Sequence, residues 1–366
     1  MITVKTPADS LIATLDWLSG FESESFPVVS LYLDARPDSR GRDHYKPFVR
    51  KELVARQRTY ALRSPERKSF EADVEKIQRY LETEVKPSAN GIAIFACSGE
   101  GDFFEALQLE PSFEENRLSV AKRPQVFLLA RLIDENPRYA LVLADTRSAR
   151  IFAVARGARI DEKELERPTR PRPYGTGSSQ MRYQRHVEHL VQEHVRELVE
   201  RLGHVVHADR VDHILLAGDE VIVALIRAEL PKRLAQKVVD TLHVDKKKPE
   251  AEIFSAAEEV LRELDSKSDT ERVDRLIGEY RAGGLVVVGL EEVRRALELG
   301  QADELLISAS LDRTGPAAEQ AAADFVALAR RTGTRVTFIE DPKLLAEVEG
   351  VGAFLRYKPA PVAETA

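Results

Sequence analysis

The sequence has very little of what a disulfide-bonded or membrane-spanning protein needs. Its 366 residues include one cysteine, so no disulfide can form within the chain. No apolar run approaches the roughly 20 residues that cross a bilayer, and no basic segment followed by an apolar one stands at the N-terminus. These absences predict a soluble, cytoplasmic protein that does not interact with membranes. Cys97 lies in the apolar run 91–97, which predicts a packed thiol and not a nucleophile.

A positive net charge is also absent, since the chain carries −7 at neutral pH, and this at first argues against nucleic acid. Local patches matter more than the sum, however. Residues 41–70 contain nine Lys and Arg against three Asp and Glu, a net charge of +6, and residues 163–185 contain six against two, a net charge of +4. Two basic segments favour two contacts with one polyanion, such as a folded RNA. The alternative is that both are solvated helix faces and loops.

The basic residues that we expect to bind RNA come from both segments. They are Arg56, Arg58, Arg63, Arg67, Lys68, Arg167, Arg170, Arg172, Arg182 and Arg185.

The second basic segment surrounds a glycine-containing loop, residues 175–180, that runs directly into a predicted helix. Upstream, the Pro- and Arg-rich run 167–173 cannot continue a regular helix, so it holds the loop away from any packed surface. Downstream, apolar residues recur every three or four positions as far as Gly203, which predicts a long amphipathic helix. These apolar residues are Val187, Leu190, Val191, Val195, Leu198, Val199 and Leu202.

The length of the chain exceeds what one hydrophobic core usually organises, and its pattern predicts three domains. Their boundaries are 1–134, 135–268 and 269–358, and a disordered tail follows at 359–366. The predicted fold class is α/β and α+β, with a mixed sheet and packed helices in each domain. The third domain is predicted to be an α/β/α sandwich.

Several local patterns make more specific predictions. Residues 125–130 read as a strand, and a helical region is predicted to break near Ser64 and Pro65. Residues 139–154 read as a β-hairpin. The polar run 265–270 either links two domains or caps a continuing helix, and residues 342–348 are predicted to form a helix.

Three segments together resemble the class-1 translation release factors of archaea and eukaryotes. This family includes the related rescue factor Pelota and bacterial relatives such as Balon-type ribosome hibernation factors. Residues 289–307, a helix ending in glycine that feeds a strand, are similar to the start of the family's third domain. Residues 90–95 resemble a strand of the first domain, and Gly177-Ser178-Ser179-Gln180 falls where the family has its Gly-Gly-Gln loop.

Two departures from the family pattern limit what the resemblance implies. Ser178 and Ser179 occupy the positions of the two glycines, and serine tolerates a positive φ poorly. Either the turn differs, or Gly177 supplies the backbone freedom one residue earlier. In the first domain, residues 62–68 replace the Asn-Ile-Lys-Ser loop with which the family reads stop codons, so stop-codon recognition is not expected.

The resemblance implies a catalytic loop made of Gly177, Ser178, Ser179 and Gln180. Hydrolysis of the ester between peptide and tRNA needs a positioned water molecule and a donor for the developing oxyanion. The backbone N–H of Gln180 suits the oxyanion, and its side-chain amide suits the water. A surface loop without chemistry is the alternative.

The histidines suggest a metal site, because His186 and His189 are spaced to share one side of the helix, with Glu193 and His194 nearby. No cysteine joins them, and we expect no metal there. The glycines near residue 284 lack the lysine and hydroxyl of a phosphate-binding loop, and no cofactor is expected.

The resemblance leaves two main functional hypotheses. In the first, the chain is a monomer that enters the ribosomal A site without reading a stop codon and rescues stalled ribosomes by hydrolysing peptidyl-tRNA. Its partners would be ribosomal RNA, peptidyl-tRNA and a translational GTPase, and not DNA. In the second, it is a non-enzymatic hibernation or stress factor that occupies the same site. Binding to some other RNA or to a protein is a third alternative.

Overall fold

The computed structural model describes residues 8–38, 41, 43–135, 138–145, 148–155, 158–166, 178–208, 211–242 and 249–357, with the backbone alone for residues 8–10, 155, 158–162, 166, 178–188 and 316. The chain divides into two compact units. The first unit combines Met1–Glu135 with Ser268–Ala366, and the second is Asn136–Lys267. No helix in the described part of the chain is long and apolar enough to cross a membrane.

The first sheet has the order β3-β2-β1-β4 and is wholly antiparallel. Its strands are β1 (Val28–Asp34), β2 (Gly91–Cys97), β3 (Phe103–Leu109) and β4 (Arg117–Ala121). Every residue of the central strands β1 and β2 is buried, because helices cover both faces. Helices α2 (Tyr45–Gln57) and α3 (Pro65–Thr83) pack on one face. Helices α1 (Ala8–Gly20) and α4 (Phe127–Asp134) pack on the other.

The C-terminal sheet has the order β10-β13-β11-β12 and also lies between helices. Its strands are β10 (Val286–Val288), β11 (Ala302–Ser308), β12 (Arg335–Ile339) and β13 (Val351–Leu355). On one face lie α9 (Leu290–Glu298) and α10 (Pro316–Thr332). The end of α8 (Glu250–Arg281) covers the other through Val273 and Leu276. The predicted α/β/α sandwich is therefore confirmed.

The second unit is built on a five-stranded sheet of order β7-β6-β5-β8-β9. Its strands are β5 (Tyr139–Ala144), β6 (Ser148–Ala155), β7 (Ala158–Glu166), β8 (His213–Gly218) and β9 (Val238–Leu242). One face is covered by α5 (Ser178–Ala208), α6 (Glu220–Glu229) and α7 (Lys232–Ala235). The first part of α8 covers the other, through Ile253, Ala257 and Leu261. The predicted hairpin is present as β5 and β6.

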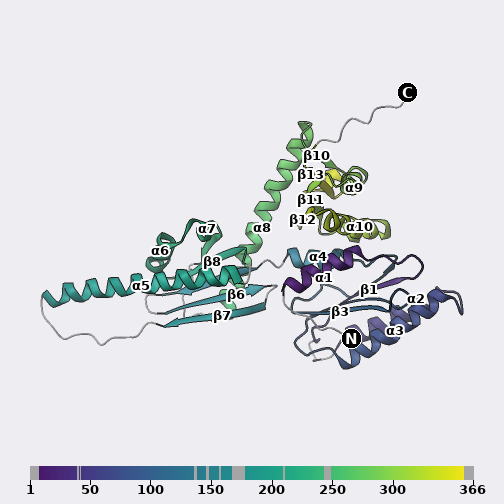
Figure 1. Cartoon of the computed structure of the whole chain (residues 1–366), viewed down its shortest axis with the longest axis horizontal. Coiled ribbons are helices and arrows are strands. Elements are labelled where there is room, and N and C mark those ends of the chain that lie inside the picture. The colour runs from purple at the N-terminus through teal and green to yellow at the C-terminus, as the bar shows by residue number, and fades with distance from the viewer. Residues whose placement is uncertain are drawn as a thin grey trace. The chain divides into compact units, whose positions relative to one another are not determined.

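Within the first unit, the N-terminal and C-terminal segments share one hydrophobic core. Leu15 of α1 and Leu129 of α4 belong to the same buried cluster as Phe325 of α10 and Phe338 of β12. Figure 1 shows α1 and α4 lying between the first sheet and α10. The two segments are therefore packed as one body and not merely tethered.

Polar contacts reinforce this shared core. Arg117 of β4 forms an ion pair with Asp312, whose side chain is only 2% exposed. The backbone N–H of Phe338 donates to the Asp134 carboxylate over 2.9 Å, which closes part of the free edge of β12. Arg131 binds Glu340 across the interface at 3.0 Å. Burial, together with the neighbouring Glu340, raises the pKa of Glu135 to about 8.

The predicted fold class is confirmed, with three sheets and packed helices. A mixed sheet was predicted in each domain, and this holds for the second and third sheets, whereas the first is wholly antiparallel. The sheets span residues 28–121, 139–242 and 286–355. The domain boundaries at 134 and 268 remain predictions.

Some local predictions were wrong. Residues 127–134 form a helix and not a strand, since a short apolar run fits either when it is buried. Residues 346–348 form only one 3₁₀ turn. The run 265–270 neither links nor caps, because α8 continues through it.

The buried pair of Arg117 and Asp312 should contribute strongly to the stability of the first unit. Replacing Arg117 with Met leaves the Asp312 carboxylate buried without its partner, and we expect a loss of about 3 to 5 kcal/mol in the free energy of unfolding. Trp17, the one tryptophan of the chain, lies on α1 in this unit, so its fluorescence during urea unfolding reports the transition.

The control is Asp16→Asn, which breaks a more exposed pair with Arg330 and should cost less than about 1 kcal/mol. The double variant Arg117→Met/Asp312→Leu should recover most of the loss. Equal effects of Arg117→Met and Asp16→Asn would contradict a special contribution from the buried pair.

Candidate nucleic-acid interface

The predicted catalytic segment is described only in part. Gly177 and the residues Arg167, Arg170 and Arg172 lie outside the described residues. The sequence had suggested that Ser178, Ser179 and Gln180 belong to a loop. Helix α5 begins at Ser178, however, so these three residues form its first turn. A helical backbone has negative φ, so neither serine needs the left-handed conformation that glycine favours.

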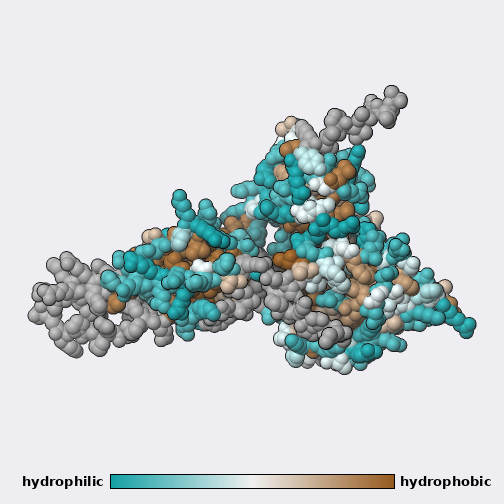
Figure 2. All heavy atoms as spheres, in the orientation of Figure 1, coloured by the Kyte–Doolittle hydropathy of each residue, from teal (hydrophilic) through white to brown (hydrophobic). Residues whose placement is uncertain are grey.

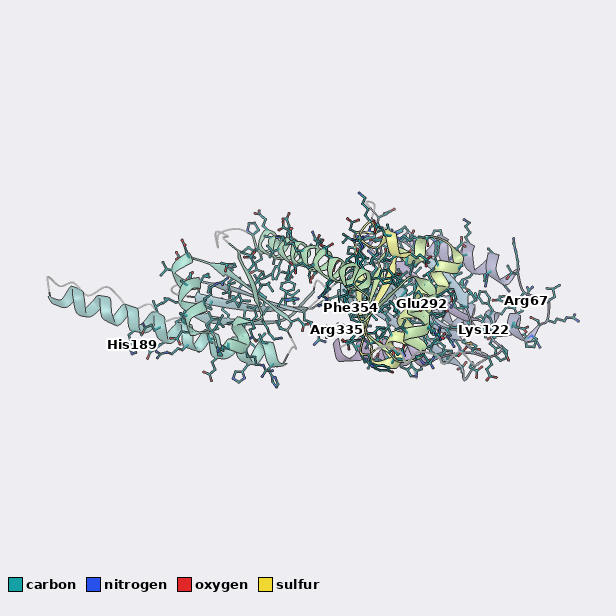
Figure 3. All side chains as sticks on the ribbon, turned by 90° about the horizontal axis from the view of Figure 1, so that it is seen from above. Arg67, Lys122, His189, Glu292, Arg335 and Phe354 are labelled. Atoms are coloured by element: carbon teal, nitrogen blue, oxygen red, sulfur yellow. The ribbon has the colours of Figure 1, made fainter. Side chains whose placement is uncertain are left out.

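Helix α5 carries this first turn away from the core of its unit. Among its described side chains, from His189 onward, Val191 packs at the edge of the core, and the buried side chains begin at His194 and continue through Val195, Leu198 and Leu202, which confirms the C-terminal part of the predicted apolar stripe. The 16 residues before His194 span roughly 24 Å at a rise of 1.5 Å per residue. His189, which lies in that part, is exposed, and Figure 3 shows it on the stretch of α5 beyond the sheet. Gln180 therefore stands at the opposite end of α5 from the half that packs into the core.

The histidines of α5 do not gather at one point. His189 is exposed and lies 3.6 Å from the Glu193 carboxylate, whereas His194 is 5% exposed. The two imidazoles thus lie on different faces of the helix. The side chain of His186 is not described, and the described residues contain no group of three His, Cys, Asp or Glu side chains able to hold a metal ion.

The first basic segment forms the hairpin of α2 and α3, and the predicted break at Ser64 and Pro65 is confirmed. The Ser64 side chain accepts a hydrogen bond from the Arg67 N–H at 3.1 Å, and Pro65 occupies the first helical position. Figure 3 shows Arg67 near one end of the first unit.

The five basic residues predicted on this hairpin fall into two groups. Arg56 donates to the Val120 carbonyl at 3.2 Å, and Arg67 binds Glu71 at 2.8 Å. Both guanidinium groups therefore support the fold. Arg58, Arg63 and Lys68 form no ion pair with other described residues and extend from the hairpin end. Sequence patterns could not separate the groups, because their partners depend on the tertiary structure.

Comparison with known proteins identifies the family. The model of bacterial archaeo-eukaryotic release factor family 10 matches residues 124–262, and the model of eRF1 domain 3 matches residues 267–359. The chain belongs to the archaeo-eukaryotic release-factor-like family. Neither model includes the α2–α3 hairpin.

Curated relatives are peptide chain release factor subunit 1 proteins. The protein of Archaeoglobus fulgidus is 27% identical over 190 residues, 50% of this chain and 46% of the relative. That of Pyrococcus abyssi is 28% identical over 271 residues, 68% of this chain and 63% of the relative. The chain thus spans about half to two thirds of these relatives. The solved structure of Dom34 from S. cerevisiae covers 79% of this chain, and this chain covers 94% of it, at 10% identity and a TM-score of 0.44.

The α2–α3 hairpin of this release-factor-like chain is fixed to the first sheet by a buried carboxylate. Asp73 of α3 accepts hydrogen bonds from the Ser98 N–H at 2.7 Å and the Ser98 hydroxyl at 2.6 Å. Burial raises the pKa of Asp73 to about 6. Cys97, the neighbour of Ser98, is buried as predicted, and burial raises the pKa of its thiol.

Asp73 should make the stability of this unit depend on pH. Because its folded pKa of about 6 exceeds the ordinary value of about 3.9, the protonated form favours folding. That contribution is complete below about pH 4 and is lost as the pH rises through 6, at about 1.4 kcal/mol per pKa unit. Asp73→Asn keeps the acceptor oxygen and should remove this decline, as measured by urea unfolding with Trp17 fluorescence from pH 4 to 7. Asp16→Asn is the control and should keep the native decline of the free energy of unfolding with pH. If Asp73→Asn showed the same decline as the native chain, Asp73 would not be its cause.

Proposed function

We propose that this release-factor-like chain binds the ribosomal A site without recognising a stop codon and rescues stalled ribosomes by releasing peptide from peptidyl-tRNA. The observation that carries the proposal is the position of Gln180. It lies in the first turn of α5, at the end of the helix that extends away from the core, within the part of the chain that matches the family model.

The first turn of α5 suits the chemistry that ester hydrolysis requires. Backbone N–H groups in a first helical turn have no partner within the helix, so the N–H of Gln180 is free of intrahelical bonding and can donate to an oxyanion. The side-chain amide then orients the attacking water. Ribosomal RNA and the tRNA supply the remaining groups. Gly177 permits the close approach, and Ser178 and Ser179 form the start of the helix.

The proposal assigns a role to each part of the chain. The basic hairpin of the first domain, residues 1–134, contacts ribosomal RNA, and so do Arg167, Arg170, Arg172, Arg182 and Arg185. The third domain, residues 269–358, binds a partner such as a translational GTPase. The factor acts as a cytoplasmic monomer and needs no metal or cofactor.

The two serines favour a second candidate. With Ser178 and Ser179 in place of glycines, the chain approaches the ester less closely than a Gly-Gly-Gln loop does. A chain that binds in the same pose without hydrolysis would be a hibernation or stress factor that protects an idle ribosome.

Peptide release from ribosomes that carry peptidyl-tRNA and an empty A site separates the two candidates. We expect the native chain to release peptide and Gln180→Ala to be about a hundredfold slower, with unchanged ribosome binding. The control Gln184→Ala changes the same residue type one helical turn later and should release peptide at the native rate. Binding without release by the native chain would reject the rescue activity in favour of hibernation.

Arg170 and Arg172 should contact phosphates. Reversing both to Glu should weaken sedimentation with ribosomes and reduce the dependence of log K on log salt by about 1.4 to 1.8. Reversing Arg295 and Arg331, two exposed residues of the C-terminal segment, makes the same change of charge elsewhere and serves as the control. Native sedimentation by the Arg170/Arg172 variant would reject contact through this segment.

A further inference from the structure

The end of the α2–α3 hairpin holds an apolar side chain where solvent surrounds it. Leu62 is 80% exposed, more than any other large apolar side chain in the described part of the chain. Its neighbour Tyr60 turns inward, with its ring 5.4 Å from that of Phe70. Tyr60 is thus half-buried against the core of the hairpin, whereas Leu62, two residues later, is left in solvent.

The segment that carries Leu62 is tightly held. The Thr59 N–H donates to the Arg56 carbonyl at 3.0 Å, and the Ser64 N–H donates to the Ala61 carbonyl at 3.2 Å. Glu71 accepts hydrogen bonds from Gln57 of α2 and Arg67 of α3, both at 2.8 Å, and so joins the two helices beside the turn. The exposure of Leu62 therefore belongs to an ordered turn.

Arg63 adopts a backbone conformation that arginine rarely takes. Its φ is +65°, one of three positive values among the described residues other than glycine. Such strain persists only where the surroundings impose it, and it is common at ligand-binding sites. Here it turns the chain directly after Leu62, in the segment that joins α2 to α3.

The charge around Leu62 is positive and unneutralised. Arg58, Arg63 and Lys68 are exposed and have no ion-pair partner among the residues that the structure describes. The acidic groups nearby are already engaged, because Glu71 binds Arg67, and Glu66 hydrogen-bonds to Ser64 and to the helix start. Figure 2 shows hydrophilic residues gathered at this end of the hairpin.

We propose that Leu62 inserts between bases of an RNA while Arg58, Arg63 and Lys68 hold the phosphates on either side. Phosphates complement the three cations, and the faces of unstacked bases accept an apolar wedge. A single leucine is too small to anchor the chain on a membrane. In this contact Leu62 meets the faces of bases and the three cations meet phosphates, and neither feature carries sequence information, so the proposed contact does not depend on sequence.

This inference rests on the proposed function only in naming ribosomal RNA as the natural ligand. It adds a residue, Leu62, and divides the basic residues of the hairpin into those that bind RNA and those that hold the fold.

The test compares two variants on two polyanions. The first is Leu62→Ala; the second combines Arg58→Gln, Arg63→Asn and Lys68→Gln, with asparagine chosen because it tolerates positive φ. The probes are an isolated RNA stem–loop and heparin, which has anionic groups but no bases. Leu62→Ala should weaken RNA binding roughly tenfold and leave heparin binding unchanged. The triple variant should weaken both and reduce the salt dependence of log K by about 2 to 3.

Two matched controls show whether the losses of binding come from these positions or from the removal of any exposed apolar side chain or positive charge. Ile12→Ala removes another exposed aliphatic side chain of the same unit, 41% exposed on α1, and should bind as the native chain does. The combination Arg295→Gln/Arg331→Gln/Arg335→Gln removes three exposed charges from the C-terminal segment and should keep the native salt dependence.

Native RNA binding by Leu62→Ala, or an equal loss on heparin, would overturn the wedge. Binding of the native chain to poly-glutamate as tight as to the stem–loop would point to an acidic protein and would also overturn the proposal. Ribosome sedimentation is measured in parallel. If the native chain fails to sediment with ribosomes, the proposed function is rejected, while the stem–loop comparison still decides the role of Leu62.

Discussion

The first unit depends on the packing of α1 and α4 against α10. This contact joins two segments that are separated by the whole second unit in sequence, and it does so with a continuous apolar core. Apolar burial is not directional, so the buried ion pair of Arg117 and Asp312 helps to fix how the N-terminal and C-terminal segments of this unit are oriented. The hydrogen bond between Asp134 and Phe338 adds a second fixed point at the edge of β12. The α2–α3 hairpin and the C-terminal sheet are thereby parts of one compact unit.

The second unit is distinguished by the length of α5, whose N-terminal half extends from the part that packs on the sheet. Helix α5 is amphipathic, and among its described side chains, from His189 onward, the fully buried ones begin at His194, with Val191 packed at the edge of the core. Its length therefore serves to extend the chain rather than to build the core. The chemistry proposed for Gln180 is compatible with that separation, because the proposal places the reacting ester in the ribosome and not in a cleft of the protein.

The sequence predicted those features that local patterns encode. The glycine-bounded helix before β11, the Ser64–Pro65 break and the hairpin of β5 and β6 all follow from period and turn residues. It failed at residues 127–134, where burial decides between helix and strand, and it did not anticipate that the end segments share a core. On the α2–α3 hairpin the sequence predicted RNA binding for all five basic residues alike. It could not set Arg56 and Arg67 apart, because their partners lie on another strand or on the next helical turn. The exposure of Leu62 had one sequence signal, an apolar residue inside a helix break.

Helix α8 carries a final consequence. It contributes Ile253, Ala257 and Leu261 to the core of one unit and Val273 and Leu276 to that of the other, and residues 262–268 between them bury no side chain. Within each set the apolar residues are three or four positions apart, so each set lies on one face of the helix. Each unit thus completes its own core with part of the same continuous helix, and substitutions among the exposed residues between the two sets should leave both cores intact.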